Sequence, residues 1–276
     1  MPVFDYHGVS VAYEQAGSGD PILFLHNLGG DRHIWTNQMR ALSATNTVYA
    51  LDLFGYGDSD TPATGYTVEN YVRMVSEFID AQGIDRLTLV GNCFGSALSL
   101  LYSRQAPQRV NALVLCSPLT AATLRPTPTG WTARAASHLP LDAVAGLIRL
   151  PGLAAHLVVR EQLGPRGRGM NGSAFAGLRD RWSEPRRLLA PAAVARDLSK
   201  LAVLDTLRPG PAFPPITTIW GARNHILSAA AGARLNATLN PVRAIELPDC
   251  GHLVMLEEPE TVTSAIRSAA RTALAG

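Results

Sequence analysis

GNCFG, residues 91–95, is the stretch of sequence that decides this fold. It follows the apolar run 87–90 and precedes a helical pattern at 96–101. Its two glycines let the backbone turn tightly between a strand and a helix, and the central side chain is left standing above the strand end. The context predicts a nucleophile elbow whose nucleophile is the Cys93 thiol. The alternative is a buried structural cysteine, because free cysteine is among the most buried residue types.

Strand and helix patterns alternate on both sides of this turn. A hairpin is expected over 3–6 and 9–15, and apolar runs typical of buried strands cover 21–26, 47–51, 87–90, 110–115, 215–220 and 242–247. Helical patterns cover 31–42, 67–83, 96–101 and 259–275. This alternation predicts an α/β fold with a mostly parallel sheet and helices on both faces.

The alternation breaks after residue 117 and returns near residue 206. The intervening segment is rich in Ala, Arg, Pro and Gly, and it predicts short helices at 141–150, 153–162 and 192–202 with a mobile loop at 164–169. A plain linker is the alternative. An insertion at the carboxyl edge of a parallel sheet lies over the place where ligands bind, so we favour a lid. The predicted division is a core segment 1–117, a helical lid 118–205 and a second core segment 206–276.

Composition excludes several classes of protein. The chain has 276 residues, 47% hydrophobic residues and a net charge of +2, which is too small to favour nucleic acid or a membrane surface as a partner. Its three cysteines, Cys93, Cys116 and Cys250, form no disulfide framework, and their spacing fits no metal site. No signal-peptide pattern or membrane-length apolar run is present. We expect a cytoplasmic protein without metal or cofactor.

Three further motifs stand at the ends of predicted strands. They are HNLGG at 26–30, DLFGYGDS at 52–59 and DCGH at 249–252. Together with the elbow, and in this order, they resemble the oxyanion loop, the D-x-x-G-x-G-x-S loop and the histidine loop of the α/β-hydrolase-fold family. The resemblance covers both core segments and implies the α/β-hydrolase fold, with a helical lid inserted into the core.

The resemblance implies a catalytic role for several of these residues. His252 is the expected base, which deprotonates Cys93 or forms an ion pair with it. Attack by sulfur on an acyl carbonyl builds negative charge on oxygen, and two backbone N–H groups must point at that oxygen. The elbow supplies one from Phe94, and the family's loop supplies the other from Leu28. Each donor contributes about 3 kcal/mol in the transition state, whereas His26 is expected to brace the loop.

The third member of the triad departs from the family pattern. The family places a carboxylate in W-G-x-x-D after a late strand, and this chain has WGARN at 220–224. The expected orienter of the imidazole is therefore Asn224, whose amide accepts the ring N–H but stabilises imidazolium less than a carboxylate does. A thiol needs less base assistance than a hydroxyl, so Cys93 with His252 and Asn224 is chemically coherent.

Five more residues are candidates for the substrate pocket. Asn27 lies in the oxyanion loop, and Trp131, Met170, Phe175 and Trp182 lie in the predicted lid. The four lid residues are equally consistent with packing inside the lid.

A thiol nucleophile on this fold resembles the thioesterase-like Dieckmann cyclases of natural-product biosynthesis. The resemblance implies an acyl-transfer enzyme that takes a polyketide or peptide chain from a carrier-protein thioester onto Cys93 and releases it by intramolecular ring closure. One alternative is a hydrolase of esters, lactones or thioesters. The other is a non-catalytic ligand-binding protein, which the missing carboxylate favours.

Overall fold

The computed structural model describes residues 1–124, 126–128, 130–131, 145, 147–170, 175–184 and 186–272. Within this part of the chain eight strands form one sheet in the order β1-β2-β4-β3-β5-β6-β7-β8. The first two strands pair antiparallel with their neighbours, and the rest of the sheet is parallel. The strands are β1 (Val3–Tyr6), β2 (Val9–Ala16), β3 (Pro21–Leu25), β4 (Thr47–Leu51), β5 (Leu87–Asn92), β6 (Val110–Cys116), β7 (Ile216–Gly221) and β8 (Arg243–Leu247).

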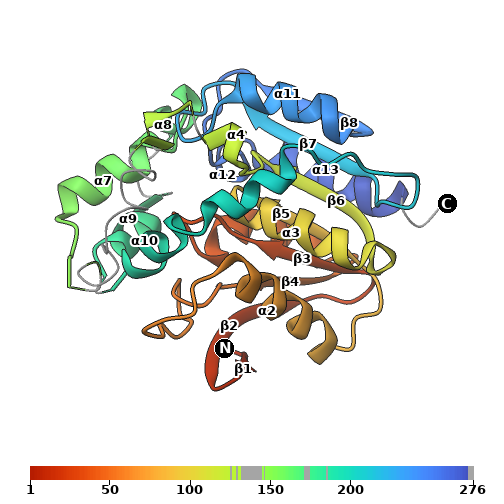
Figure 1. Cartoon of the computed structure of the whole chain (residues 1–276), viewed down its shortest axis with the longest axis horizontal. Coiled ribbons are helices and arrows are strands. Elements are labelled where there is room, and N and C mark those ends of the chain that lie inside the picture. Colours follow the sequence, from red (N-terminus) through yellow and green to blue (C-terminus); the bar gives the residue numbers. More distant parts are fainter. Residues whose placement is uncertain are drawn as a thin grey trace.

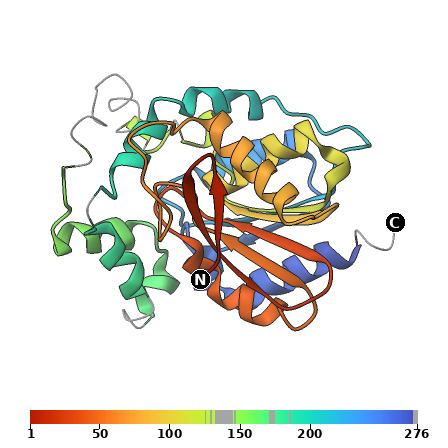
Figure 2. The same ribbon diagram turned by 90° about the horizontal axis from the view of Figure 1, so that it is seen from below.

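Helices cover both faces of the sheet (Figure 2), which confirms the predicted fold class. One apolar cluster joins the sheet to α2 (Val68–Ala81), α3 (Phe94–Gln105) and α11 (Ala229–Leu239). The other joins it to α1 (Thr36–Leu42) and α13 (Pro259–Thr272). Short 3₁₀ turns precede α1 and β6, at η1 (Arg32–Trp35) and η2 (Pro107–Arg109).

The pleat of the strands explains why both clusters form. Leu23 and Leu25 of β3 enter the first cluster, and Ile22 and Phe24 enter the second. Successive side chains of a strand point to opposite faces, so a continuous apolar run is what a strand covered on both faces requires.

The helices between β6 and β7 gather at one end of the molecule (Figure 1). They are α4 (Ala121–Leu124), α7 (Gly152–Glu161), α8 (Pro165–Gly169), α9 (Ala176–Trp182), α10 (Leu189–Ala195) and η4 (Leu198–Leu204). The expected helix at 153–162 is α7, and the expected helix at 192–202 is divided between α10 and η4. Half of the expected helix at 141–150 lies outside the described residues. The segment's function as a lid stays a prediction.

The glycine-rich segment at 164–169 is not the loop that its sequence predicts. It forms α8, and a buried carboxylate explains why: Glu257, at the end of α12 (Val254–Glu257), accepts the N–H groups of Gly164 at 2.9 Å and Gly167 at 3.0 Å. The same carboxylate accepts the N–H of Gly251 at 2.8 Å. Glu257 therefore holds α8 against the loop that carries His252.

No helix in the described ranges combines the length and the apolar character that crossing a bilayer requires.

Candidate active site

The elbow between β5 and α3 has the backbone geometry that its glycines predict. Cys93 has φ of 53° and ψ of −109°, a conformation that L-residues rarely adopt. Both flanking glycines are sterically required, because a Cβ on Gly91 lies 2.4 Å from the carbonyl carbon of Gly95, and one on Gly95 lies 2.1 Å from the oxygen of Leu25. The strain at Cys93 is sustained by this close packing of strand, turn and helix.

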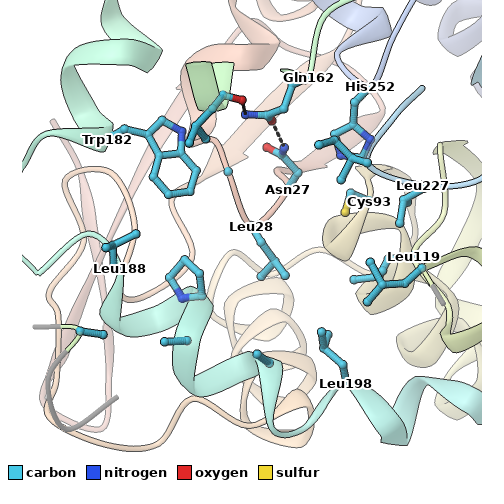
Figure 3. A pocket seen from close by; sticks show the side chains of 18 of the residues that line it. Asn27, Leu28, Cys93, Leu119, Gln162, Trp182, Leu188, Leu198, Leu227 and His252 are labelled. Carbon is cyan, nitrogen blue, oxygen red and sulfur yellow. Dashed lines mark hydrogen bonds between the residues drawn. The ribbon is translucent and has the colours of Figure 1, made fainter. Parts of the chain in front are cut away.

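Cys93 opens onto a cavity of about 490 Å³. Its side chain is only 5% exposed. Figure 3 shows Cys93 and His252 together at one side of this cavity, with aliphatic side chains around them. The labelled apolar residues of the lining are Leu28, Leu119, Trp182, Leu188, Leu198 and Leu227. The described lining contains no Asp, Glu, Lys or Arg, so it suits an uncharged apolar group.

Two backbone donors meet at the sulfur. The backbone N–H groups of Leu28 and Phe94 both lie close enough to the Cys93 sulfur to lower the pKa of its thiol. The two loops are tied together, because the N–H of Gly95 donates to the carbonyl oxygen of His26 at 3.1 Å. The structure therefore brings the two predicted oxyanion donors to the same atom, and their catalytic role stays a prediction.

Burial keeps both reactive groups neutral. It raises the pKa of the Cys93 thiol to about 12, against the opposing effect of the two N–H donors. It lowers the pKa of the His252 imidazole to about 3. Charged forms of both groups are disfavoured away from water, so at neutral pH the resting site holds a thiol and a neutral imidazole rather than the ion pair considered above.

We expect alkylation of Cys93 by iodoacetamide to accelerate about tenfold per pH unit between pH 7 and 10, because only the thiolate reacts and its pKa lies above that range. Peptide mass spectrometry at fixed times measures the rate at Cys93. A small-molecule thiol run in parallel approaches its plateau near its own pKa. An inflection of the Cys93 rate between pH 6 and 7 would show instead that an imidazole controls the thiol.

His252 and Asn224 form a hydrogen bond, but its direction is the opposite of the one expected: the amide donates and the ring accepts. The amide nitrogen of Asn224 lies 3.1 Å from Nδ1 of His252 and 3.1 Å from Oγ of Ser117. The amide oxygen accepts the N–H groups of Ile226 and Leu227, both at 3.0 Å. The expectation that the amide accepts the ring N–H is therefore wrong. The oxygen is already engaged by two backbone donors, so the NH₂ group faces the ring.

Two polar residues of the motifs, His26 and Asp52, have structural contacts. His26 hydrogen-bonds through Nδ1 to the oxygen of Asn27 at 2.7 Å, and its Nε2 accepts the N–H of Leu53 at 3.0 Å. Asp52 accepts the N–H of Arg32 at 2.7 Å and that of Asp58 at 2.8 Å. Both side chains brace loops, and neither lines the cavity.

The predicted pocket residues divide into two groups. Asn27 and Trp182 line the cavity. Trp131 is 73% exposed and does not line it. Met170 and Phe175 line a separate cavity of about 100 Å³. Their assignment to the substrate pocket is therefore wrong.

Helix α7 explains why the two cavities are separate. Val158 lines the larger cavity, whereas His156 and Val159 line the smaller one. The two sets of side chains belong to different faces of the same helix, and residue type alone does not reveal which face a neighbouring residue will meet.

Gln162 is a site residue that the motifs did not reveal. It lines the cavity, its Oε1 accepts the side-chain N–H of Asn27 at 3.0 Å, and its backbone oxygen accepts the N–H of His252 at 2.7 Å. It thus joins the inserted segment to both the oxyanion loop and the histidine loop. No motif surrounds it, and its position just after α7 was the only signal in the sequence.

Fold and site together define an α/β-hydrolase-fold protein. Residues 20–149, somewhat less than half of the chain, match the family described as alpha/beta hydrolase fold. A thermophilic esterase from Thermogutta terrifontis has the same fold, with a TM-score of 0.81 and 22% identity over 98% of this chain and 97% of the esterase. The chain therefore has the α/β-hydrolase fold, as its motifs predict.

Sequence relatives agree with this assignment. An uncharacterised protein of Mycobacterium tuberculosis is 27% identical over 268 residues, which are 92% of this chain and 76% of the relative. A haloalkane dehalogenase of Agrobacterium fabrum is 35% identical over 119 residues, or 43% of this chain and 38% of the dehalogenase. The predicted fold is thus confirmed, and the proteins that this chain resembles in sequence or fold include a dehalogenase and an esterase.

Proposed function

We propose that this protein is an acyl-transfer enzyme that forms a thioester between Cys93 and an uncharged acyl chain. The observation that carries the proposal is the convergence of the Leu28 and Phe94 N–H groups on the Cys93 sulfur at the wall of an apolar cavity. Donors already aimed at the nucleophile lie beside the oxygen of any carbonyl that the sulfur attacks, where the developing charge is stabilised without reorganisation.

The chemistry favours a substrate that arrives as a thioester. The Cys93 sulfur bonds to the carbonyl carbon, the bond to the outgoing sulfur breaks, and the proton lost by Cys93 ends on the departing thiol. One thioester replaces another, so little free energy is gained or lost. Delivery on the phosphopantetheine arm of an acyl or peptidyl carrier protein fits this step.

The next step distinguishes two related activities. In the proposed cyclase, a nucleophile within the acyl chain attacks the Cys93 thioester, a ring closes, and the thiol is released with a proton. In the alternative, water is the nucleophile and a free acid leaves. The names of the esterase and the dehalogenase favour a hydrolase. The resemblance of a thiol elbow to thioesterase-like cyclases favours ring closure.

The third possibility, a ligand-binding protein without catalysis, is favoured by the amide at position 224. Exposure to a series of acyl thioesters of N-acetylcysteamine, followed by intact-protein mass spectrometry, tests it. We expect an acyl adduct at Cys93 and, from β-ketoacyl-aminoacyl surrogates, a cyclic product with little free acid. Free acid in excess would establish the hydrolase, and the absence of any adduct or product would overturn acyl transfer.

The same series of acyl thioesters, varied in chain length, tests whether the acyl chain occupies the cavity. Each methylene transferred from water to an apolar lining is worth about 0.8 kcal/mol, so the specificity constant kcat/KM should rise about fourfold per added CH₂ until the cavity is full. A flat dependence on chain length would show that the acyl chain does not occupy the cavity.

A further inference from the structure

The polarity of the Asn224 amide is fixed by its surroundings. Two backbone N–H groups, those of Ile226 and Leu227, point at one terminal atom of the side chain at 3.0 Å each. That atom must be the oxygen, since an NH₂ group there would set donor against donor. The NH₂ group is consequently on the other side, where Oγ of Ser117 and Nδ1 of His252 accept from it.

The amide in turn fixes the proton of the imidazole. A neutral imidazole has one N–H and one lone pair, and Nδ1 must use its lone pair to accept from Asn224. The proton is therefore on Nε2. Nε2 is buried without a hydrogen-bond partner among the described residues, and His252 lines the cavity beside Cys93 (Figure 3). The site thus presents an N–H donor to a substrate, with no lone pair available to take a proton.

Among the described residues, no charged group bonds to the imidazole of His252 and reverses this assignment. The described neighbours that bond to His252 are neutral: Asn92 from β5 donates to its backbone oxygen, Gln162 accepts its backbone N–H, and Asn224 faces its ring. The other titratable group on the described cavity wall is the Cys93 thiol. Glu257 is bound to the N–H of Gly251 and two further backbone donors.

We propose that Asn224 is a positioning residue that holds His252 as the Nε2–H tautomer, so that an acyl chain on Cys93 is shielded from hydrolysis. The chain is released when an acidic carbon within it, which loses its proton to solvent without help from the imidazole, attacks the carbonyl carbon and Cys93 leaves as the thiolate. Hydrolysis requires water to form a bond to the carbonyl carbon while one of its protons is removed and the carbon–sulfur bond breaks. The imidazole that would remove that proton has no free lone pair. This part of the inference rests on the proposed acyl transfer, whereas the tautomer does not.

The expected size of the tautomer's effect on hydrolysis can be taken from serine triads in which the orienting residue was changed. Replacing the orienting carboxylate of a serine triad by an amide leaves the geometry intact and lowers kcat about 10⁴-fold, because the imidazole adopts the wrong tautomer. This chain carries the amide already. Asn224→Asp is the reverse change: one carboxylate oxygen keeps the N–H groups of Ile226 and Leu227, and the other accepts from Nδ1, which leaves the lone pair on Nε2.

Nuclear magnetic resonance of ¹⁵N-labelled imidazoles tests the tautomer directly, with the His252 signals assigned by their loss in His252→Gln. We expect a protonated Nε2 and an unprotonated Nδ1 in the wild type, and the opposite in Asn224→Asp. Asn37→Asp, which adds the same charge at an exposed position of α1, should match the wild type. A protonated Nδ1 in the wild type overturns the proposal, and this measurement requires no folded variant at position 224.

The lifetime of the acyl adduct provides the second test. After a pulse of an acyl thioester that has no internal nucleophile, we expect Asn224→Asp to release free acid at least about 100-fold faster than the wild type and Asn37→Asp. Equal lifetimes of the adduct in all three proteins overturn the shielding. If no adduct forms in any of them, acyl transfer itself fails, and the resonance experiment still decides the tautomer.

Discussion

Cys93→Ala is expected to lower kcat/KM for an acyl thioester by about 10³-fold or more, while leaving the fold unchanged. Removal of the nucleophile from a covalent triad costs about 10⁶ in kcat in a well-characterised case, and the residual activity comes from oxyanion donors and binding. Alanine keeps the Cβ of this side chain and removes only the sulfur, which lies at the wall of a cavity, so stability should change little. Turnover of a thioester surrogate, with circular dichroism as the check on folding, measures both.

Two further variants sharpen this experiment. Cys116→Ala removes a buried thiol that does not line the cavity, and it should retain wild-type turnover. Cys93→Ser should lose nearly as much activity as alanine, because a hydroxyl needs a base and Nδ1 of His252 accepts from the Asn224 amide. A serine variant with activity near that of the wild type would contradict both the thiol chemistry and the assigned tautomer.

Gly95→Ala is expected to lower the free energy of unfolding by about 3 kcal/mol or more. The new methyl carbon would lie 2.1 Å from the oxygen of Leu25 and 2.9 Å from that of His26, and both obstacles are backbone atoms that cannot rotate away. Overpacking of a tight core costs about 1–3 kcal/mol and sometimes more. For a chain of this size each kcal/mol lowers Tm by about 2–4 °C, so calorimetry should record a fall of about 6–12 °C.

Gly177→Ala is the matched control for this change. Gly177 lies in α9, and a Cβ there meets no atom within 4 Å. Because alanine is preferred to glycine in a helix by about 1 kcal/mol, Tm should stay the same or rise. If both variants melt at the wild-type temperature, the elbow has room for a side chain and its glycines are not sterically required.

The core of the fold was predictable because its signals are local. Apolar runs, capping residues and the two glycines around Cys93 act through neighbouring backbone atoms, and the strands and helices follow them closely. The helix at 67–83 shows this, because Thr67 caps it by accepting the N–H of Asn70 and Gly83 follows its end with a positive φ of 64°.

The errors concern contacts between segments that are distant in sequence. Met170 and Phe175 line the smaller cavity rather than the one beside Cys93, because α7 lies between the two cavities. The sequence around Gly164 predicts a loop, because the carboxylate that orders this segment belongs to Glu257, 93 residues away. The direction of the Asn224 hydrogen bond depended on two N–H groups whose orientation only the folded turn defines.

The carboxylate of Glu257 has a practical consequence for chimeric enzymes. It accepts hydrogen bonds from Gly164 and Gly167 in the inserted segment and from Gly251 in the loop before the imidazole. Grafting a relative's insertion onto this core would leave that buried anion facing foreign backbone and would displace the histidine. A productive graft must carry residues 162–169 and 249–257 together, as one unit of exchange.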